Sequence, residues 1–405
     1  MTYAIILLII VIAAALAFEY INGFHDAANA IATVVSTKVL SPRVALLYGA
    51  ILNFFGAFFG THVAKTIGAG IVDKVAVSQE VILFALIGAI VWNLLTWAFG
   101  IPSSSSHALI GGLLGAAIAH NGFGVVHLDG LINKVIIPMF TSPLIGFLLG
   151  FSLMLVLLWM FAKASPEKIN KKFKGLQVFS AGIMAFSHGS NDAQKVMGII
   201  TLSLITFSFS TLGIVGKSVS YDPNTQQAVM PLDKDCYAAS RAEELKTDSA
   251  ITGQIIDYDR NTHHAKIELP NGAVVEKVEI NNIEKEFLVP VWVIFICALT
   301  MGLGTMAGGW KIIRTLGNKV IKLKPIHGFA AETTAATTIL TASWFGIPVS
   351  TTHIISTAIM GVGSTIRFSA VKWGLVGNIV LAWFLTIPIC AALAAVLYLL
   401  FSSGQ

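Results

Sequence analysis

The sequence predicts an all-α polytopic membrane protein with about 10–12 transmembrane segments, arranged as two inverted repeats with broken helices and re-entrant hairpins. Of the 405 residues, 55% are hydrophobic and only 12% are charged. Apolar runs long enough to cross a bilayer recur from one end of the chain to the other. Two short motifs occur in the same order in both halves, which indicates an internal duplication.

The apolar runs form two sets with the same order: a long run, two helix-length runs, a short run behind a proline, and a closing run. The first set covers 1–40, 44–63, 81–99, 103–119 and 139–162, and the second covers 176–216, 288–310, 325–345, 349–363 and 373–400. The long run that opens each set exceeds one straight crossing. The predicted boundaries are 1–162 for the first repeat, 175–216 and 288–405 for the second, and 217–287 for an insert.

The charges of the loops predict the orientation. Four loops carry mostly Lys and Arg, which places them in the cytoplasm: 36–43, 163–174, 311–324 and 364–372. Alternating crossings then put both termini and the insert outside the cytoplasm, in a multi-pass protein of the cell (inner) membrane. Helix 81–99 runs inward and helix 325–345 runs outward, so the halves are inverted. Thr2–Phe18 resembles a signal peptide but has no basic segment before it, and we interpret it as a mature helix.

The insert differs in composition from the rest of the chain. Residues 217–288 hold 8 basic and 13 acidic residues. Polar and apolar residues alternate in Ala265–Leu269 and in Val274–Ile280, and Asn271-Gly272 between them is a strong hairpin signal. The sequence therefore predicts a small soluble β-rich subdomain with a structural role.

A proline motif occurs once in each half. Residues 99–111 read Phe-Gly-Ile-Pro-Ser-Ser-Ser-Ser-His-Ala-Leu-Ile-Gly, and residues 345–357 read Phe-Gly-Ile-Pro-Val-Ser-Thr-Thr-His-Ile-Ile-Ser-Thr. Proline suits the first turn of a helix and serine or threonine suits its cap, so we expect a helix to restart here. Its free N–H groups, the positive end of its dipole and the hydroxyls then point at the break. Two such starts facing each other would enclose an oxyanion; the alternative is a pair of ordinary capped helices.

An acidic motif occurs once in each long run. Residues 22–30 read Asn-Gly-Phe-His-Asp-Ala-Ala-Asn-Ala, and residues 187–195 read Ser-His-Gly-Ser-Asn-Asp-Ala-Gln-Lys. A carboxylate at bilayer depth costs ~2.5–3.5 kcal/mol on insertion scales, so such residues are usually kept for ions or protons. Small residues around each acid are typical of an unwound helix, whose freed carbonyls can coordinate a cation. The sequence predicts a cation site at Asp26 and Asp192; the alternative is a carboxylate that caps a helix in a loop.

Other polar residues accompany these motifs. The neutral oxygen donors of the acidic motifs are Asn22, Asn29, Asn191 and Gln194. The histidines of the four motifs are His25, His107, His188 and His353. A histidine at a helix break commonly satisfies backbone groups, but a pKa of about 6.5 also permits proton coupling, which we favour most for His25. We expect Lys195 to balance Asp192 or to help hold an anion. Glu332 is predicted to be a cation or proton site, with a buried ion pair as the alternative, and Glu19 is predicted to lie at the membrane interface.

These motifs resemble those of the inorganic phosphate transporter (PiT) family. The resemblance covers nearly the whole chain apart from the insert. It implies inverted repeats that move phosphate with a cation, with the signature acids at Asp26 and Asp192. Its substrate-holding hydroxyls fall on Ser104, Ser105, Ser106, Ser350, Thr351 and Thr352. The first signature departs from the common Gly-Ala-Asn-Asp form, because this chain reads Gly23-Phe24-His25-Asp26. That form resembles the bacterial low-affinity branch, which takes up metal-phosphate complexes with protons.

The leading hypothesis is a secondary active symporter, not an enzyme, that imports inorganic phosphate or a metal-phosphate complex with H⁺ or Na⁺ by alternating access. The candidate phosphate-binding residues are Ser104, Ser105, Ser106, Ser350, Thr351, Thr352 and Gln194. The candidate coupling residues are Asp26, Asn22, Asn29, Asn191, Asp192, Glu332 and His25, with Asp26 and Asp192 as metal ligands if sodium drives uptake.

The expected partners are phosphate, the coupling cation, the lipid bilayer and a second copy in a homodimer, with no nucleic acid and no resident cofactor. The alternatives are a sulfate symporter of the same fold, a passive anion channel, and an intramembrane protease with Asp26 and Asp192 as its dyad. The protease is disfavoured because the chain lacks a Gly-x-Gly-Asp element.

Overall fold

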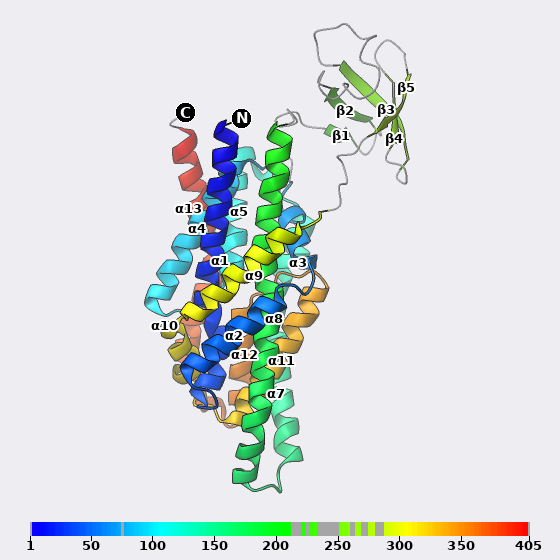
Figure 1. Cartoon of the computed structure of the whole chain (residues 1–405). Helices are drawn as coiled ribbons and strands as arrows, with labels where there is room; N and C mark the ends of the chain where they lie inside the picture. The colour runs from blue at the N-terminus through cyan, green and yellow to red at the C-terminus, as the bar shows by residue number, and fades with distance from the viewer. Residues whose placement is uncertain are drawn as a thin grey trace. The chain divides into compact units, whose positions relative to one another are not determined.

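The computed structural model describes residues 2–73, 77–211 and 287–403, and the backbone of five strands between the last two ranges. The chain divides into two compact units, Met1–Phe207 with Val289–Gln405, and Ser208–Leu288. The described part of the first unit is almost entirely helical (Figure 1).

The helices follow the order predicted from the apolar runs. Those of the first half are α1 (Thr2–Ser36), α2 (Pro42–Gly56), α3 (His62–Ala69), α4 (Gln79–Phe99), α5 (Ser105–Asn121), α6 (Leu128–Leu131) and α7 (Ile137–Met160). Those of the second half are α8 (Pro166–Thr211), α9 (Val291–Ala307), α10 (Trp310–Arg314), α11 (Pro325–Trp344), α12 (Thr351–Ser364) and α13 (Trp373–Ser402). The start of α1 and the end of α13 lie at the same end of the unit, opposite the turn from α7 to α8 (Figure 1).

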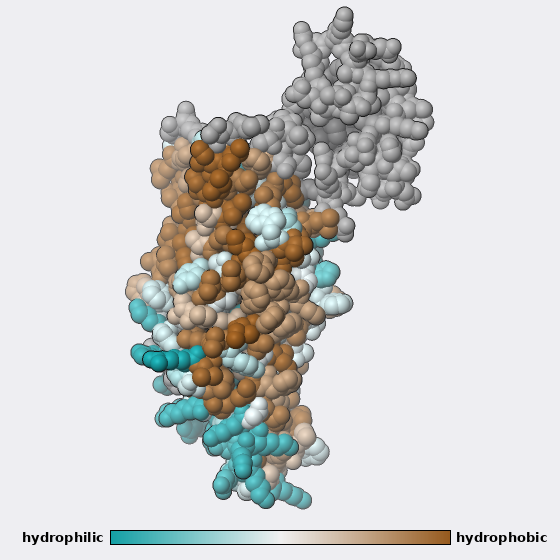
Figure 2. Space-filling model, viewed as in Figure 1, coloured by the Kyte–Doolittle hydropathy of each residue, from teal (hydrophilic) through white to brown (hydrophobic). Residues whose placement is uncertain are grey.

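Several helices have the length and apolarity of membrane spans. Among the described residues these are α1, α4, the continuous segment Leu128–Met160, and α13. The pair α9 and α10, bent by 60° at a short break, makes a fifth if it is counted as one span. Hydrophilic residues gather toward the end that carries the α7–α8 turn, whereas most of the visible remainder of the helical unit is apolar (Figure 2). An apolar outer surface of this extent is typical of a lipid-facing unit, because large apolar patches are rare on soluble proteins.

Several boundaries differ from the expectation. Segment 311–324, predicted as a loop, is mostly helical, because α10 and a π-helix at Thr315–Lys319 cover it. The apolar run 44–63 is not one helix, because it breaks between α2 and α3. The Lys-rich segment 163–174 is not a loop over its whole length, because α8 already begins at Pro166. Proline is favoured in the first turn of a helix and lysine has good helix propensity, so this exposed segment extends α8 by two turns.

The two short helices behind the proline motifs lie inside the unit. α5 contacts α4 and α13, and α12 contacts α7 and α11. Every residue of Ser105–Ala117 and of Thr351–Gly363 is buried. Because other helices surround them, α5 and α12 can be shorter than a membrane span, and their first turns lie in the protein interior.

Each proline motif breaks the chain in the same way. Gly100 and Gly346 have φ of +66° and +65°, which reverses the chain after α4 and α11. Glycine suits this left-handed conformation because it has no Cβ. The next helix begins behind a serine cap: Ser104 and Ser350 each accept a hydrogen bond from the backbone N–H three residues later, at 3.2 and 3.3 Å. The predicted serine caps are therefore confirmed.

The predicted position of the prolines is wrong. Pro102 and Pro348 lie two residues before their caps, not in the first helical turn. The chain between glycine and cap is non-helical, which suits proline and the residue before it. The side-chain oxygens of the serines can accept hydrogen bonds from the free N–H groups at the helix start, so serine occupies the cap position.

The described strands of the second unit form one antiparallel sheet in the order β1-β2-β3-β4-β5. The strands are β1 (Ser220–Asp222), β2 (Gln227–Leu232), β3 (Ile251–Asp259), β4 (His264–Glu268) and β5 (Val274–Glu279). The strands β4 and β5 pair with each other, as the alternating runs on both sides of Asn271-Gly272 predict.

Candidate functional site

The two signature acids meet in the buried interior of the helical unit. Asp26 of α1 and Asp192 of α8 are at most 3% exposed. Together with His188 they offer three ligand atoms that all lie within 4.8 Å of one another. Carboxylate oxygens with an imidazole nitrogen at this spacing suit a single cation.

Asp192 is held by a fixed positive charge. The Lys195 ammonium, one helical turn further along α8, forms an ion pair with Asp192 Oδ1. His188 Nε2 lies 3.1 Å from Asp192 Oδ2, and Thr351 Oγ1 donates to the same oxygen at 3.0 Å. Asp192 is thus a buried but paired carboxylate, which is the arrangement expected where a charge is removed from water.

Asp26 has different partners. His25 Nδ1 lies 2.8 Å from Asp26 Oδ1, and Thr352 Oγ1 donates to that oxygen at 3.4 Å. The other ring nitrogen of His25 lies 3.0 Å from Thr96 Oγ1 of α4, which fixes the ring. Within the described residues Asp26 has no Lys or Arg partner. Its charge is balanced by a cation only if His25 is protonated or an ion binds beside it.

The first turns of α5 and α12 meet at these acids. Lys195 donates to Ser106 Oγ of α5, and to the Val349 carbonyl beside the cap of α12 at 3.0 Å. Asn29 of α1 donates to Thr351 Oγ1 at 3.2 Å and to Thr352 Oγ1 at 2.8 Å. α1 and α8 therefore hold the two helix starts against each other.

The histidines of the proline motifs touch as well. The rings of His107 and His353 lie 4.9 Å apart, and His353 stacks on Trp383 of α13 at 4.0 Å. Trp383 Nε1 donates to the Pro102 carbonyl, which ties α13 to the first break. These contacts bring both motifs to one interface in the interior.

This arrangement is chemically suited to an oxyanion with a cation. Two helix starts bring positive dipole ends and free N–H groups together, hydroxyls surround them, and Lys195 adds one full positive charge. Several buried polar atoms here lack a hydrogen-bond partner: Asn22 Oδ1, Asn29 Oδ1, Ser105 Oγ, His107 Nδ1 and both ring nitrogens of His353. Buried polar groups normally have partners, so this number of open ones points to an occupant.

Two predicted site residues contact other parts of the interior. Gln194 Oε1 accepts from the Val63 N–H at 2.8 Å, and Gln194 Nε2 donates to the Phe59 carbonyl, so it caps the start of α3 rather than facing the helix starts. Asn191 Nδ2 donates to Ser343 Oγ at 2.8 Å, near the end of α11, while its Oδ1 is open. Asn191 and Gln194 join α8 to the α3 and α11 region.

Glu332 forms a separate buried cluster. Thr33 of α1 and Ser180 of α8 donate to its two carboxylate oxygens, and Gln177 Nε2 donates to Oε1 at 3.2 Å. Thr33 lies seven residues after Asp26, or about 10.5 Å along the helix axis, on the same face of α1. The predicted alternative of a buried ion pair is wrong for the described residues, because the partners of Glu332 are neutral donors.

The prediction for Glu19 is also wrong. Glu19 is 0% exposed, so it lies inside the helical unit and not at the interface. Its position in α1 puts it on the same face as Asn22 and Asp26, at spacings of three and four residues. The sequence contained this signal, because Glu19, Asn22, Asp26, Asn29 and Thr33 recur at helical spacing inside an apolar run.

The acidic motifs do not unwind their helices. α1 and α8 are continuous through both acids. The small residues serve close helix packing instead: a Cβ on Gly23 would meet the Met301 carbonyl oxygen at 2.7 Å, and one on Gly189 would meet the Asn53 carbonyl oxygen at 2.1 Å. Side chains, not freed carbonyls, therefore supply the polar atoms of the site.

Some residues of the site carry no motif of their own. Thr96 of α4 positions His25 and accepts from Ser103 Oγ at 2.9 Å. Asn53 of α2 has its Oδ1 3.1 Å from His188 Nδ1. The Nδ2 of the same residue donates a hydrogen bond to Thr305 Oγ1 at 2.8 Å. In the sequence, the sign of such supporting residues is a single polar residue within an otherwise apolar helix.

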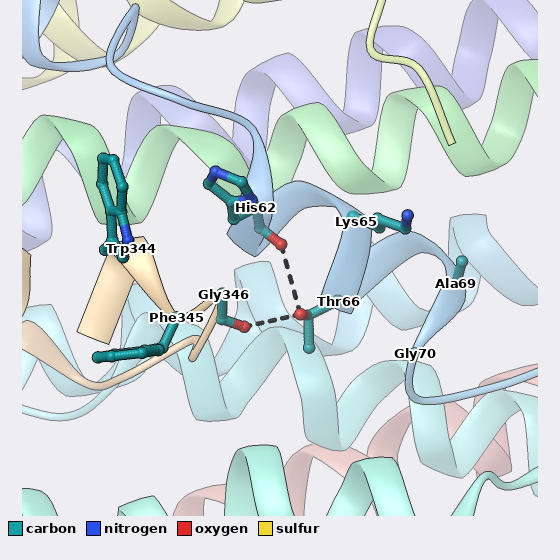
Figure 3. A pocket seen from close by; sticks show the side chains of 8 residues that line it. All are labelled: His62, Lys65, Thr66, Ala69, Gly70, Trp344, Phe345 and Gly346. Carbon is teal, nitrogen blue, oxygen red and sulfur yellow. Dashed lines mark hydrogen bonds between the residues drawn. The ribbon is translucent and has the colours of Figure 1, made fainter. Parts of the chain in front are cut away.

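An open cavity of about 330 Å³ lies beside the second break (Figure 3). α3 contributes His62, Lys65 and Thr66 to its lining, and the end of α11 contributes Trp344 and the Phe345-Gly346 turn. Thr66 Oγ1 donates to the Gly346 carbonyl at 2.6 Å, which ties α3 to this turn (Figure 3). The lining of this cavity includes neither carboxylate of the buried site.

The fold defines a polytopic membrane protein whose interior holds two buried carboxylates beside two capped helix starts. The model of the phosphate transporter family matches residues 22–394. Because this match covers most of the chain, the protein belongs to the phosphate transporter family.

Similar proteins extend over the whole chain. A Rhizobium meliloti (strain 1021) protein named "Probable low-affinity inorganic phosphate transporter" is 42% identical over 398 residues, covering 98% of this chain and 97% of that protein. A Bacillus subtilis (strain 168) protein of the same name is 40% identical, with 98% of each chain covered. A solved structure titled "The sodium-dependent phosphate transporter" has a TM-score of 0.74 over 98% of this chain and 99% of that one at 23% identity, which shows a shared fold.

Proposed function

We propose that the protein is a secondary active importer of inorganic phosphate, coupled to H⁺ or Na⁺. One observation carries the proposal: two capped helix starts meet beside a pair of buried carboxylates, of which only Asp192 has a lysine partner. Helix starts and hydroxyls bind oxyanions without a net charge of their own, whereas unbalanced carboxylates attract cations. The family membership and the names of the full-length relatives support phosphate as the anion.

The charges explain why transport must be coupled. Asp26 and Asp192 carry two negative charges and Lys195 carries one positive charge, so the centre is negative before phosphate arrives. A phosphate monoanion or dianion makes it more negative. An uncompensated charge in the membrane interior is costly, so the loaded centre moves only with additional cations. Asp26, His188 and Asp192 are the proposed ligands of one such cation.

The proposed phosphate ligands are the hydroxyls at the two helix starts. Ser105 is the first candidate, because its Oγ is buried and open. Ser106, Thr351 and Thr352 already hydrogen-bond to Lys195, Asn29 or an acid, and they would exchange these partners for phosphate oxygens. Ser104 and Ser350 keep their capping role and contribute mainly by holding the helix starts in place. Gln194 is no longer part of the proposed phosphate site, because it caps α3.

The contacts at the two breaks support an inverted repeat with alternating access. Thr66 of α3 donates to the Gly346 carbonyl at 2.6 Å, and Thr315, after α10, donates to the Gly100 carbonyl at 3.0 Å. Each half thus supplies one threonine that holds the turn of the other half. Movement of one half against the other would exchange these contacts and open the centre to opposite sides in turn.

We propose that the protein lies in the cell (inner) membrane. The distribution of Lys and Arg in the loops favours an orientation with both termini and the insert outside the cytoplasm. We further propose a homodimer and phosphate taken up alone or as a metal-phosphate complex. The mass of the solubilised protein tests the dimer.

Uptake of radiolabelled phosphate into proteoliposomes tests the function. Sodium and proton gradients are imposed separately, with and without Mg²⁺, and unlabelled sulfate serves as a competitor. We expect accumulation above the external concentration with one of the gradients. Equilibration without accumulation would indicate a passive channel, and competition by sulfate equal to that by phosphate would overturn phosphate selectivity.

A further inference from the structure

The geometry points to a second cation-binding site at Glu19, one that a monovalent coupling cation occupies between the extracytoplasmic side and the central acids. The chemistry is a single buried carboxylate neutralised by a proton or a sodium ion. This inference rests on the proposed function, because it assigns a step of the same coupled uptake.

The first support is the environment of the carboxylate. Glu19 is 0% exposed, neither of its carboxylate oxygens has a hydrogen bond of normal geometry, and the side-chain donor near them is Asn22. Buried carboxylates are normally paired with a cation or with several donors. The carboxylate of Glu332 accepts hydrogen bonds from three side chains, whereas Glu19 has a single side-chain amide, that of Asn22, nearby. An ionised Glu19 therefore needs a bound cation.

The second support is its place along α1. Glu19, Asn22 and Asp26 follow at spacings of three and four residues, which puts them on one face of the continuous helix. Seven residues separate Glu19 from Asp26, or about 10.5 Å of axial rise. Glu19 is closer to the N-terminus, and we propose that this end faces outside. A cation that enters from outside thus meets Glu19 before Asp26.

Open polar atoms lie along this face and on the neighbouring helix. Asn22, the next residue on the face, has an open Oδ1. α4 contacts α1 through Thr96 and His25, and one turn before Thr96 both amide atoms of Asn93 are buried and open. These oxygens can accept hydrogen bonds from a hydrated cation on its way between the two carboxylates.

The charged and titratable neighbours favour a monovalent cation. Glu19 lies within electrostatic range of Asp192 and Lys195 of α8 and of the buried thiol of Cys297 of α9. On α4 the one titratable residue is Glu80, in the first turn. Within the described residues the group of three ligands suited to a metal is Asp26, His188 and Asp192, and Glu19 is not in it. One carboxylate without further charged ligands suits a single positive charge and not a divalent ion.

The second half has no copy of this residue. Aligning Asp192 with Asp26 places Ala185 of α8 at the position of Glu19. Glu19 is therefore not needed to build the duplicated fold, and a role in directional coupling accounts for its burial in one half alone.

Glu19→Gln tests the inference, because glutamine keeps the volume and removes the charge. Two measurements are compared in proteoliposomes: net uptake of radiolabelled phosphate driven by a gradient, and exchange of labelled for unlabelled phosphate at equal concentrations on both sides. We expect net uptake to fall by about tenfold or more, because one coupling cation loses its intermediate site, while exchange stays within about twofold of wild type. A pH-sensitive dye and a sodium-sensitive dye inside the vesicles identify the cation.

The exposed Glu167→Gln is the matched control for the same chemical change outside the site. Glu19→Asp should recover part of the net uptake, since it restores the charge on a shorter side chain. The inference is overturned if Glu19→Gln takes up phosphate at the wild-type net rate, or if exchange is lost together with net uptake, which would indicate a packing role. Failure of the wild type to exchange phosphate would instead refute the proposed function.

Discussion

The two acidic motifs have the same arrangement of side chains, but the negative charge of the aspartate is neutralised differently in each. Each places one aspartate at the centre, and the residue three positions later reaches a helix start: Asn29 after Asp26, and Lys195 after Asp192. Lysine forms an ion pair with its aspartate, but asparagine adds no charge. The breaks at Gly100 and Gly346 are, by contrast, nearly identical in φ and in capping. The two motifs therefore share one architecture but differ in charge: Asp192 has a fixed cation, Lys195, and under the proposed function the charge of Asp26 is left for the mobile cation.

Removing the fixed cation should have the largest effect. Lys195→Met leaves Asp192 buried without its ion pair, and breaking a buried pair by removing one partner costs ~3–5 kcal/mol. We expect a large drop in the thermal unfolding midpoint in detergent. The double variant Lys195→Met with Asp192→Asn should recover most of the loss, because it leaves no unpaired charge. Equal stability of the single and double variants would show that the pair is not what holds this region.

The two aspartates should respond differently to neutralisation. Asp26→Asn and Asp192→Asn should each lower net phosphate uptake by ~100-fold, since one uncompensated charge at bilayer depth costs ~2.5–3.5 kcal/mol. Stability separates them: Asp26→Asn should change it by less than ~1 kcal/mol, whereas Asp192→Asn leaves Lys195 unpaired and should cost ~3–5 kcal/mol.

The exposed Asp129→Asn is the control for expression and reconstitution. Wild-type uptake by Asp26→Asn would remove that carboxylate from the coupling scheme. A stability loss as large as that of Asp192→Asn would remove the distinction between the halves.

The element order was predictable because apolar runs and their spacing depend on local composition. The end of each run lies within a few residues of a helix end for α4, α7 and α11. The serine caps were predictable because Ser104 and Ser350 follow a recognisable break. The breaks that depend on packing were not: the division between α2 and α3 lies in an apolar run with no proline.

The site was predictable in its motifs but not in its pairings. Whether α1 unwinds at Asp26 depends on what packs against Gly23, and that neighbour is almost 280 residues away, at Met301. The burial of Glu19 likewise depends on which face of α1 the other helices cover. Such contacts between distant segments are tertiary and are not encoded in the local pattern.

The comparison also applies to α4 and α11, the helices that precede the proline motifs. Glu332 of α11 corresponds to Leu86 of α4 when the two prolines are aligned. Glu332→Gln keeps the side-chain volume but weakens the bonds from Thr33 and Ser180, and charge-assisted hydrogen bonds contribute ~1.5–3 kcal/mol each. We expect a stability loss of ~1.5 kcal/mol, because the amide oxygen still accepts one bond, and net uptake lowered more than exchange. Glu332→Leu, which copies the first half, should cost more, since the three donors are left without an acceptor. If the leucine variant were the more stable of the two, the donors would have other partners.

The smallest effects should come from the caps, and they should be equal in the two halves. Ser104→Ala and Ser350→Ala each remove one capping bond at a helix start, which costs ~1 kcal/mol, whereas serine to glycine at the same positions costs only a few tenths. Thermal unfolding of the two alanine variants and their glycine counterparts measures this directly. A difference of more than ~1 kcal/mol between Ser104→Ala and Ser350→Ala would mean that one break is held mainly by the opposite half, through Thr315 or Thr66, and that the equivalence of the two helix starts does not extend to their energetics.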